Sequence, residues 1–157
     1  MTKRLPLLFS FRQPVFGEGF LAGIKMDGRA LMDEGDETWL TGVAPVGFAA
    51  NGADRGAAFL AFRNAWVAIL FDIASESRSF GEFKKSCEGF LSAASHNLTA
   101  DWEAALADVR RTSYVDPNLK REPSADQKKV RFEIVDLTQF QHTPEENILE
   151  AGLQAAA

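Results

Sequence analysis

The chain has 157 residues, of which 46% are apolar and 25% charged, as in an ordinary soluble globular protein able to bury a core. Its formal net charge of −5 argues against a nucleic-acid surface, which needs clustered lysine and arginine. The charge is compatible with a basic partner, although many proteins carry it simply for solubility. A single cysteine, Cys87, excludes an internal disulfide.

The N-terminal apolar run, residues 5–9, is too short for a signal-peptide core, so we expect a cytoplasmic protein. Short apolar runs separated by turn residues fill the first third of the chain. The predicted strands are residues 5–11, 20–26, 29–32 and 38–43. We expect Pro14 to end the first strand, and Asp27-Gly28 to form a two-residue hairpin turn. Such closely spaced strands pair antiparallel, because parallel neighbours need a long crossover.

From Ala53 the apolar period changes to three and four residues, which predicts a long helix. Its apolar face carries Phe59, Phe62, Trp66, Ile69 and Ile73. Charged residues interrupt the run, so we interpret it as a core helix rather than a membrane span.

Two further helices follow this long helix. Ser79 and Glu82 have the spacing of a capping box, and Thr99 is the expected cap of the third helix. Residues 113–129 are polar and contain two prolines, which indicates a linker. Residues 130–137 alternate like a strand, and a short helix is predicted near the C-terminus. We therefore divide the chain into residues 1–112 and residues 113–157, which can complete the same domain.

The fold class predicted is α+β, an antiparallel meander of three to four strands packed against a long helix, then further helices and a late strand. We find no catalytic, metal-binding or cofactor-binding motif. Cys87 lies between Phe83 and Phe90 on an apolar stripe, where we expect a buried, inert thiol. His96 is expected at a helix end, where imidazolium favours the C-terminal dipole.

The acidic turn carries Asp33, Glu34, Asp36 and Glu37, and its spacing differs from that of an EF-hand loop. We interpret it as a solvated hairpin tip, with a protein-binding acidic patch as the next alternative.

Residues 19–75 resemble the HicB-type antitoxin domain, in which a meander leads through a Pro- and Gly-containing corner into a helix. Pro45-Val46-Gly47 stands at the corner and Asn51-Gly52 at the loop. Ala53 and Gly56 replace the usual Thr and Glu of the helix cap, so Asp54 would supply the acidic element at the helix start.

The resemblance implies a degraded ribonuclease H fold without metal ligands, and a non-enzymatic protein that neutralises a small basic RNA-cleaving toxin. Homo-oligomers are expected, through the edge of the meander or the late strand. DNA binding is not expected, because the late strand and final helix lack a second helix for a ribbon-helix-helix. The residues proposed to contact a partner are Asp33, Glu34, Asp36, Glu37, Pro45, Gly47, Asn51 and Gly52.

Two alternatives come from other classes of protein. The high Phe and Trp content suggests a small-ligand or regulatory domain with a cleft between sheet and helices, unless these rings simply fill the core. A hydrolase using Asp33, Asp36 and Asp72 would require the three carboxylates to meet in one cavity.

Overall fold

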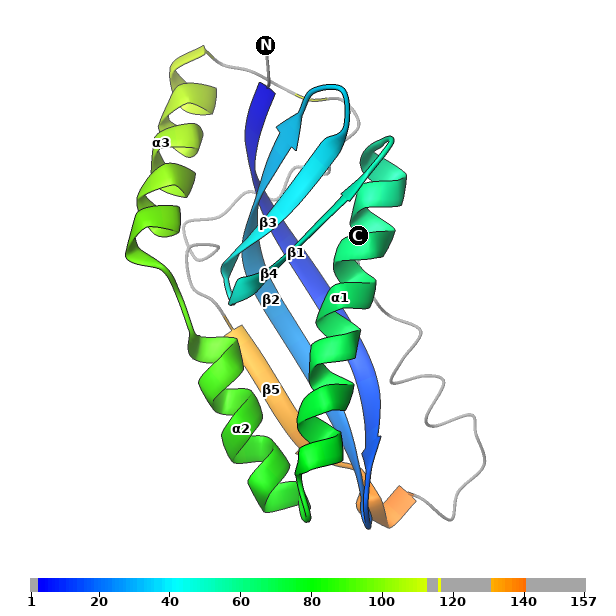
Figure 1. The fold of residues 1–157 in the computed structure, drawn as a ribbon. Coiled ribbons are helices and arrows are strands. Elements are labelled where there is room, and N and C mark those ends of the chain that lie inside the picture. The colour runs from blue at the N-terminus through cyan, green and yellow to red at the C-terminus, as the bar shows by residue number, and fades with distance from the viewer. Residues whose placement is uncertain (1–2, 113–115, 117–130, 141–157) are drawn as a thin grey trace.

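A computed structural model describes residues 3–112, 116 and 131–140 of the chain, shown in Figure 1. Its strands and helices follow in chain order: β1 (Lys3–Gly17), β2 (Phe20–Glu34), β3 (Thr38–Ala44), β4 (Val46–Gly52), α1 (Arg55–Glu76), α2 (Phe80–Ser92), α3 (His96–Thr112), β5 (Arg131–Asp136) and the 3-10 turn η2 (Thr138–Phe140). The predicted C-terminal helix lies outside the described residues, as does the predicted linker apart from Asp116.

The strands form one antiparallel sheet in the order β1-β2-β3-β4, with β5 paired to β2. The long strand β2 pairs along its whole length with β1. On its other edge the first half, residues 22–27, pairs with β5, and the second half, residues 29–34, pairs with β3. This arrangement confirms the predicted α+β class, and it places the late strand in the sheet formed by the N-terminal strands.

The first two strands are longer than predicted. Pro14 does not end β1, which continues to Gly17 and pairs at Pro14 with Gly23. Among the described residues β1 pairs only with β2, and an edge strand tolerates a proline because the missing N–H faces away from the ladder. The hairpin turn follows at Glu18 and Gly19, where Gly19 has a φ of 77°.

The expected turn at Asp27-Gly28 is wrong, because β2 runs through both residues. Asp27 lies opposite Ser10, whose hydroxyl donates a hydrogen bond to the Asp27 carboxylate. A Cβ on Gly28 would come within 2.5 Å of both the Ala44 carbonyl oxygen and the Phe9 ring. Glycine is therefore needed here for a close approach within the sheet, and not for a turn.

Helices α1 and α2 cover one face of the sheet (Figure 1). This face carries the odd-numbered residues of β1 and the even-numbered residues of β2, because residues directly opposite in an antiparallel pair share a face. The core beneath is largely aromatic, and Phe48 stacks on Phe62 with ring centroids 4.4 Å apart. Trp66 packs on Phe11 at 5.1 Å, so the abundant rings fill the interior between sheet and helix.

Helix α3 packs on the opposite face of the sheet. Its Trp102 and Ala105 are buried against Leu31 and Val43. The Trp102 indole N–H donates to the carbonyl oxygen of Leu7 at 3.3 Å. The upper half of the sheet is thus enclosed between α1 and α3 (Figure 1).

The helix starts test three sequence predictions. Asp54 is the N-cap of α1, and its carboxylate accepts a hydrogen bond from the Ala57 backbone N–H at 2.8 Å. This confirms Asp54 as the acidic element at the helix start. Ser79 caps α2 as predicted, accepting from the Glu82 N–H at 3.2 Å.

The prediction for the third helix is wrong at its start. Helix α3 begins at His96, so Thr99 lies within it and Ser95 provides the cap, its hydroxyl accepting from the Leu98 N–H at 3.3 Å. His96 consequently lies at the positive end of a helix, and not at a C-terminal end. The short spacing between Ala93 and His96 contains no glycine or proline that would have indicated this boundary.

Candidate interaction surface

Six of the eight residues proposed to contact a partner meet at one end of the molecule. The β2–β3 turn supplies four acids, and the end of β4 lies beside them because Thr38 pairs with Gly52. We call this surface the acidic end, formed by Asp33, Glu34, Asp36, Glu37, Trp39, Asn51 and Gly52. It lies at the tip of the cyan hairpin in Figure 1.

The other two residues lie at the opposite end of the β3–β4 hairpin. Strands of seven residues separate them from the acidic end by roughly 20 Å. Pro45 is buried, and the neighbouring Val46 N–H donates to the Ala93 carbonyl oxygen at 3.1 Å, which ties the corner to the end of α2. Gly47 is exposed with a φ of 107°. The corner therefore does not form one continuous surface with the acidic turn.

Two carboxylates of the acidic end are held by arginines from neighbouring elements. Asp33 accepts two hydrogen bonds from Arg4 of β1, at 2.7 and 3.3 Å. Glu34 accepts two from Arg55 at the start of α1, at 2.9 and 2.6 Å. The hydrogen bonds from Arg55 hold the pKa of Glu34 below its usual value. These pairs fix the position of the turn.

Arg55 also bonds the buried carboxylate of Asp116, with 2.5 Å between the Nη2 and Oδ2 atoms. Both carboxylates raise the pKa of the Arg55 guanidinium, chiefly through these hydrogen bonds. One guanidinium thus joins the end of β2, the start of α1 and the segment that contains Asp116.

The remaining polar residues of the acidic end face solvent. Asp36 and Glu37 are exposed, and Glu37 accepts a hydrogen bond from the Asn51 side-chain amide at 2.7 Å. Among the described residues immediately around the turn, Asp54 and Asp116 add two acids to the four of the turn, and Lys3, Arg4 and Arg55 are the bases beside them, so the local charge is negative.

Trp39 is the residue of this surface that sequence reasoning missed. Its side chain is 47% exposed, and it lies directly opposite both Asp33 and Asn51 in the sheet, on the same face as each. Side chains alternate between the two faces of a strand, so the alternation along residues 38–43 could have indicated that Trp39 points outward. In the structure its neighbours Thr38 and Leu40 are indeed buried. A large exposed ring beside carboxylates can hold a lysine or arginine side chain by charge and by cation–π contact.

The three carboxylates considered for a hydrolase do not meet. Asp33 and Asp36 lie at the acidic end, whereas exposed Asp72 lies on α1 seventeen residues beyond Arg55, roughly 25 Å along the helix. Within residues 3–112, 116 and 131–140, no three His, Cys, Asp or Glu side chains are grouped to hold a metal ion.

The thiol of Cys87 is fully buried within the core, as predicted. Burial raises its pKa to about 12. The thiol is therefore protonated at neutral pH, and it is a poor nucleophile.

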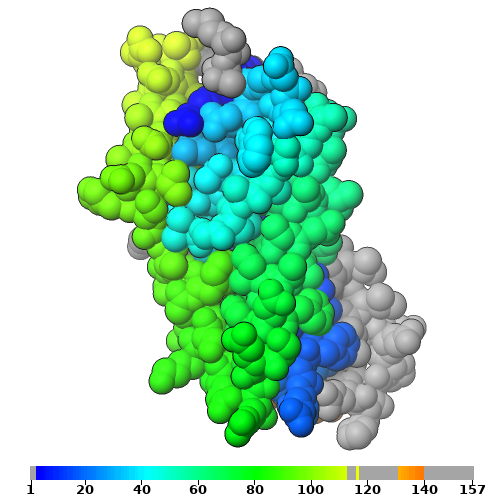
Figure 2. Space-filling view, viewed as in Figure 1, coloured from blue at the N-terminus to red at the C-terminus, as the bar shows by residue number. Residues whose placement is uncertain are grey.

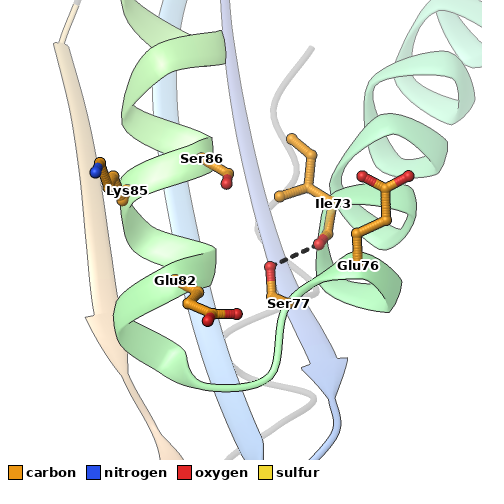
Figure 3. Close-up of a pocket in the computed structure, with 6 residues that line it drawn as sticks. All are labelled: Ile73, Glu76, Ser77, Glu82, Lys85 and Ser86. Atoms are coloured by element: carbon orange, nitrogen blue, oxygen red, sulfur yellow. Dashed lines mark hydrogen bonds between the residues drawn. The ribbon is translucent and has the colours of Figure 1, made fainter.

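A shallow pocket of about 260 Å³ lies where α1 ends and α2 begins, and Figure 3 shows the residues around it. The Ser77 hydroxyl donates to the Ile73 carbonyl oxygen at 2.7 Å, and the Glu82 carboxylate accepts from the Arg78 N–H at 2.8 Å. The Ser77 hydroxyl and the Glu82 carboxylate are thus already hydrogen-bonded to backbone groups at the helix ends. The volume is also below the roughly 300–1,000 Å³ of usual ligand sites. We assign this pocket no ligand.

Comparisons with models of protein families, with curated proteins and with solved structures gave no match to this chain.

Proposed function

We propose that this chain is a non-enzymatic protein-interaction module that binds a small basic protein through its acidic end. By the resemblance of residues 19–75 to HicB-type antitoxins, the partner would be an RNA-cleaving toxin that the chain neutralises. Acidic side chains attract such a partner over distance, and complementary charges accelerate association and fix its orientation.

The observation that carries this proposal is the exposure of Trp39 between the acidic end of β2 and the end of β4. Tryptophan is enriched among the few interface residues that contribute most of the binding free energy. It lies here beside Asn51, an amide that can donate and accept hydrogen bonds, and near exposed Asp36 and Glu37. Ordered carboxylates around an exposed ring suit a basic polypeptide better than an apolar one.

The test is to purify the tagged chain from its native host at low ionic strength and to identify the proteins bound to it. We expect a small basic protein that cleaves RNA when alone, and whose cleavage stops when the purified chain is added back. Recovery of the chain without a basic protein, or a captured protein whose RNA cleavage is unaffected, would contradict the proposal.

The variant Trp39→Ala locates the interface, and Phe16→Ala is its matched control. Both residues are exposed aromatics on strands, but Phe16 lies at the other end of the sheet, beside the β1–β2 turn. Trp39→Ala should reduce capture of the basic protein strongly, whereas Phe16→Ala should leave it unchanged. Equal capture by the two variants would exclude the acidic end as the binding surface.

A further inference from the structure

The outer face of α1 is an apolar stripe that no described element covers. The buried side of α1 is formed by Ala58, Phe62, Trp66, Leu70 and Ala74, four residues apart. On the opposite side Leu60 is 58% exposed and Phe71 is 37% exposed. The exposed or half-exposed residues of this outer stripe are Ala57, Leu60, Ala61, Asn64, Ala68 and Phe71. The green surface of α1 runs along the molecule in Figure 2.

Helix α1 carries more apolar residues than its contacts with the sheet require. A helix on the surface of a globular protein usually has one polar side, and a helix that is apolar all round is usually buried on all sides. By length and composition alone α1 could even cross a membrane, yet only 28% of its most apolar window is buried in this chain. The outer stripe is therefore suited to packing against a second surface.

We propose that this surface is a second copy of the same chain, with the two α1 helices packed antiparallel about a two-fold axis. An interface of this kind requires a stripe that is complementary to itself. The stripe meets this condition, because Leu60 and Phe71 are centred between positions 65 and 66, and Asn64 and Ala68 are centred on position 66. Leu60 of each copy then lies against Phe71 of the other, and small side chains between them permit close approach.

Asn64 supports a second copy rather than an unrelated apolar partner. It is exposed, and it is the polar residue in the middle of the stripe. Each Asn64 lies two residues from the centre of the contact. The two Asn64 residues would therefore lie about 6 Å apart along the helix axis. An amide both donates and accepts, so the pair can bond to each other, and a single asparagine within an apolar helix contact commonly fixes register.

The charges at the two ends of α1 also fit an antiparallel pair. Asp54, the N-cap, and Arg78, two residues beyond the helix end, are both exposed and are again centred on position 66. In an antiparallel pair Asp54 of each copy therefore lies beside the end of the other helix that carries exposed Arg78 together with exposed Glu76. A parallel pair would instead place like charges together.

The area of the contact sets the expected strength. Helix α1 has 22 residues and is about 33 Å long, and a strip about 10 Å wide on each copy gives roughly 700 Å² in total. This is below the roughly 1,600 Å² of a standard stable interface. We therefore expect a weak, reversible dimer that forms at high protein concentration, unless flanking residues enlarge the contact.

Sedimentation velocity of the full chain from about 5 to about 200 µM tests the dimer over this range. The wild-type protein should shift from monomer to dimer. Leu60→Glu should remain monomeric, and Leu8→Glu should behave as wild type because Leu8 is an exposed leucine on β1, away from α1. Circular dichroism verifies that both variants fold. A wild-type protein that stays monomeric throughout, or a Leu60→Glu protein that dimerises normally, would overturn the proposal.

Cysteine cross-linking tests the antiparallel direction. Under mild oxidation a mixture of Leu60→Cys and Phe71→Cys proteins, of different tag length, should form the mixed disulfide far more than either symmetric one. The native Cys87 is buried and should not react. Predominant disulfides between two copies of Leu60→Cys would show a different packing and overturn this one.

Vesicle sedimentation distinguishes a lipid surface as the covering partner. We expect no binding to phosphatidylcholine vesicles, or to vesicles with added phosphatidylserine. Binding by a monomeric wild-type protein that is lost in Leu60→Glu would assign the stripe to a membrane surface and overturn the dimer.

Discussion

Gly28 illustrates how a single residue can carry two conflicting signals. Next to Asp27 it has the local signature of a hairpin turn. In the sheet it lies opposite Phe9, and the Ala44 carbonyl oxygen leaves no room for a Cβ. Local propensity is a weak preference, and it is overridden here by the pairing of β2 with β1 along its whole length and with β5 as far as Asp27.

We expect Gly28→Ala to destabilise the protein by about 2 kcal/mol or more, because a carbonyl oxygen held in the sheet cannot move aside cheaply. Gly89→Ala is the matched control. Gly89 lies in α2 with open space around its Cβ direction, so alanine there should stabilise by about 0.5–1 kcal/mol. Urea denaturation of the three proteins measures both changes, and equal effects of the two substitutions would contradict this assignment.

At the scale of elements, the start of α1 joins the sheet to the helix. Asp54 caps the first turn, while the next residue, Arg55, reaches back to Glu34 at the end of β2. The capping role was predictable from the sequence, since an acidic residue preceded the apolar period. The ion pair was not, because nothing in the sequence brings positions 34 and 55 together until β2, β3 and β4 are paired.

We expect Asp54→Ala to cost about 1 kcal/mol of stability, since the Ala57 N–H loses its acceptor, and Asp54→Asn to cost much less. Thermal or urea unfolding provides the comparison. If asparagine destabilised as much as alanine, the negative charge rather than the cap would be the important feature.

The pair of Glu34 and Arg55 makes a prediction about pH. The pKa of Glu34 is lowered in the folded state from its ordinary value of 4.5, so its ionised form stabilises the fold. This contribution is complete above pH about 4.5 and is lost as the pH falls through the lower folded-state pKa.

The free energy of unfolding of wild type should thus exceed that of Glu34→Gln near neutral pH. The difference between the two free energies should shrink as the solution is acidified below pH about 4.5. Urea titrations at a series of pH values measure it. A difference that stays constant to strongly acidic pH would mean that the Glu34 carboxylate does not act through its charge.

For the whole molecule, the sequence was sufficient for the fold class, because turns and apolar periods are local signals. It divided β2 into two strands, however, and it did not predict β4. The acidic turn and Asn51-Gly52 were among the residues expected to contact a partner, and the register of the sheet brings them onto one surface. Pro45 and Gly47 were expected there too, but they lie at the far end of the hairpin. The sequence did not single out Trp39, whose importance depends on which acids lie across the neighbouring strands. Surfaces built from several strands depend on register, which is set over the whole sheet.

The most direct test of the proposed interaction is the affinity of the captured basic partner, measured by calorimetry for wild type, Trp39→Ala, Asp36→Asn and Phe16→Ala. We expect Trp39→Ala to weaken binding by about 2 kcal/mol or more, a loss of roughly thirtyfold. Asp36→Asn should weaken binding mainly at low salt, and Phe16→Ala should bind as wild type. If all four proteins bound the partner with the same affinity, the acidic end would not be the interaction surface.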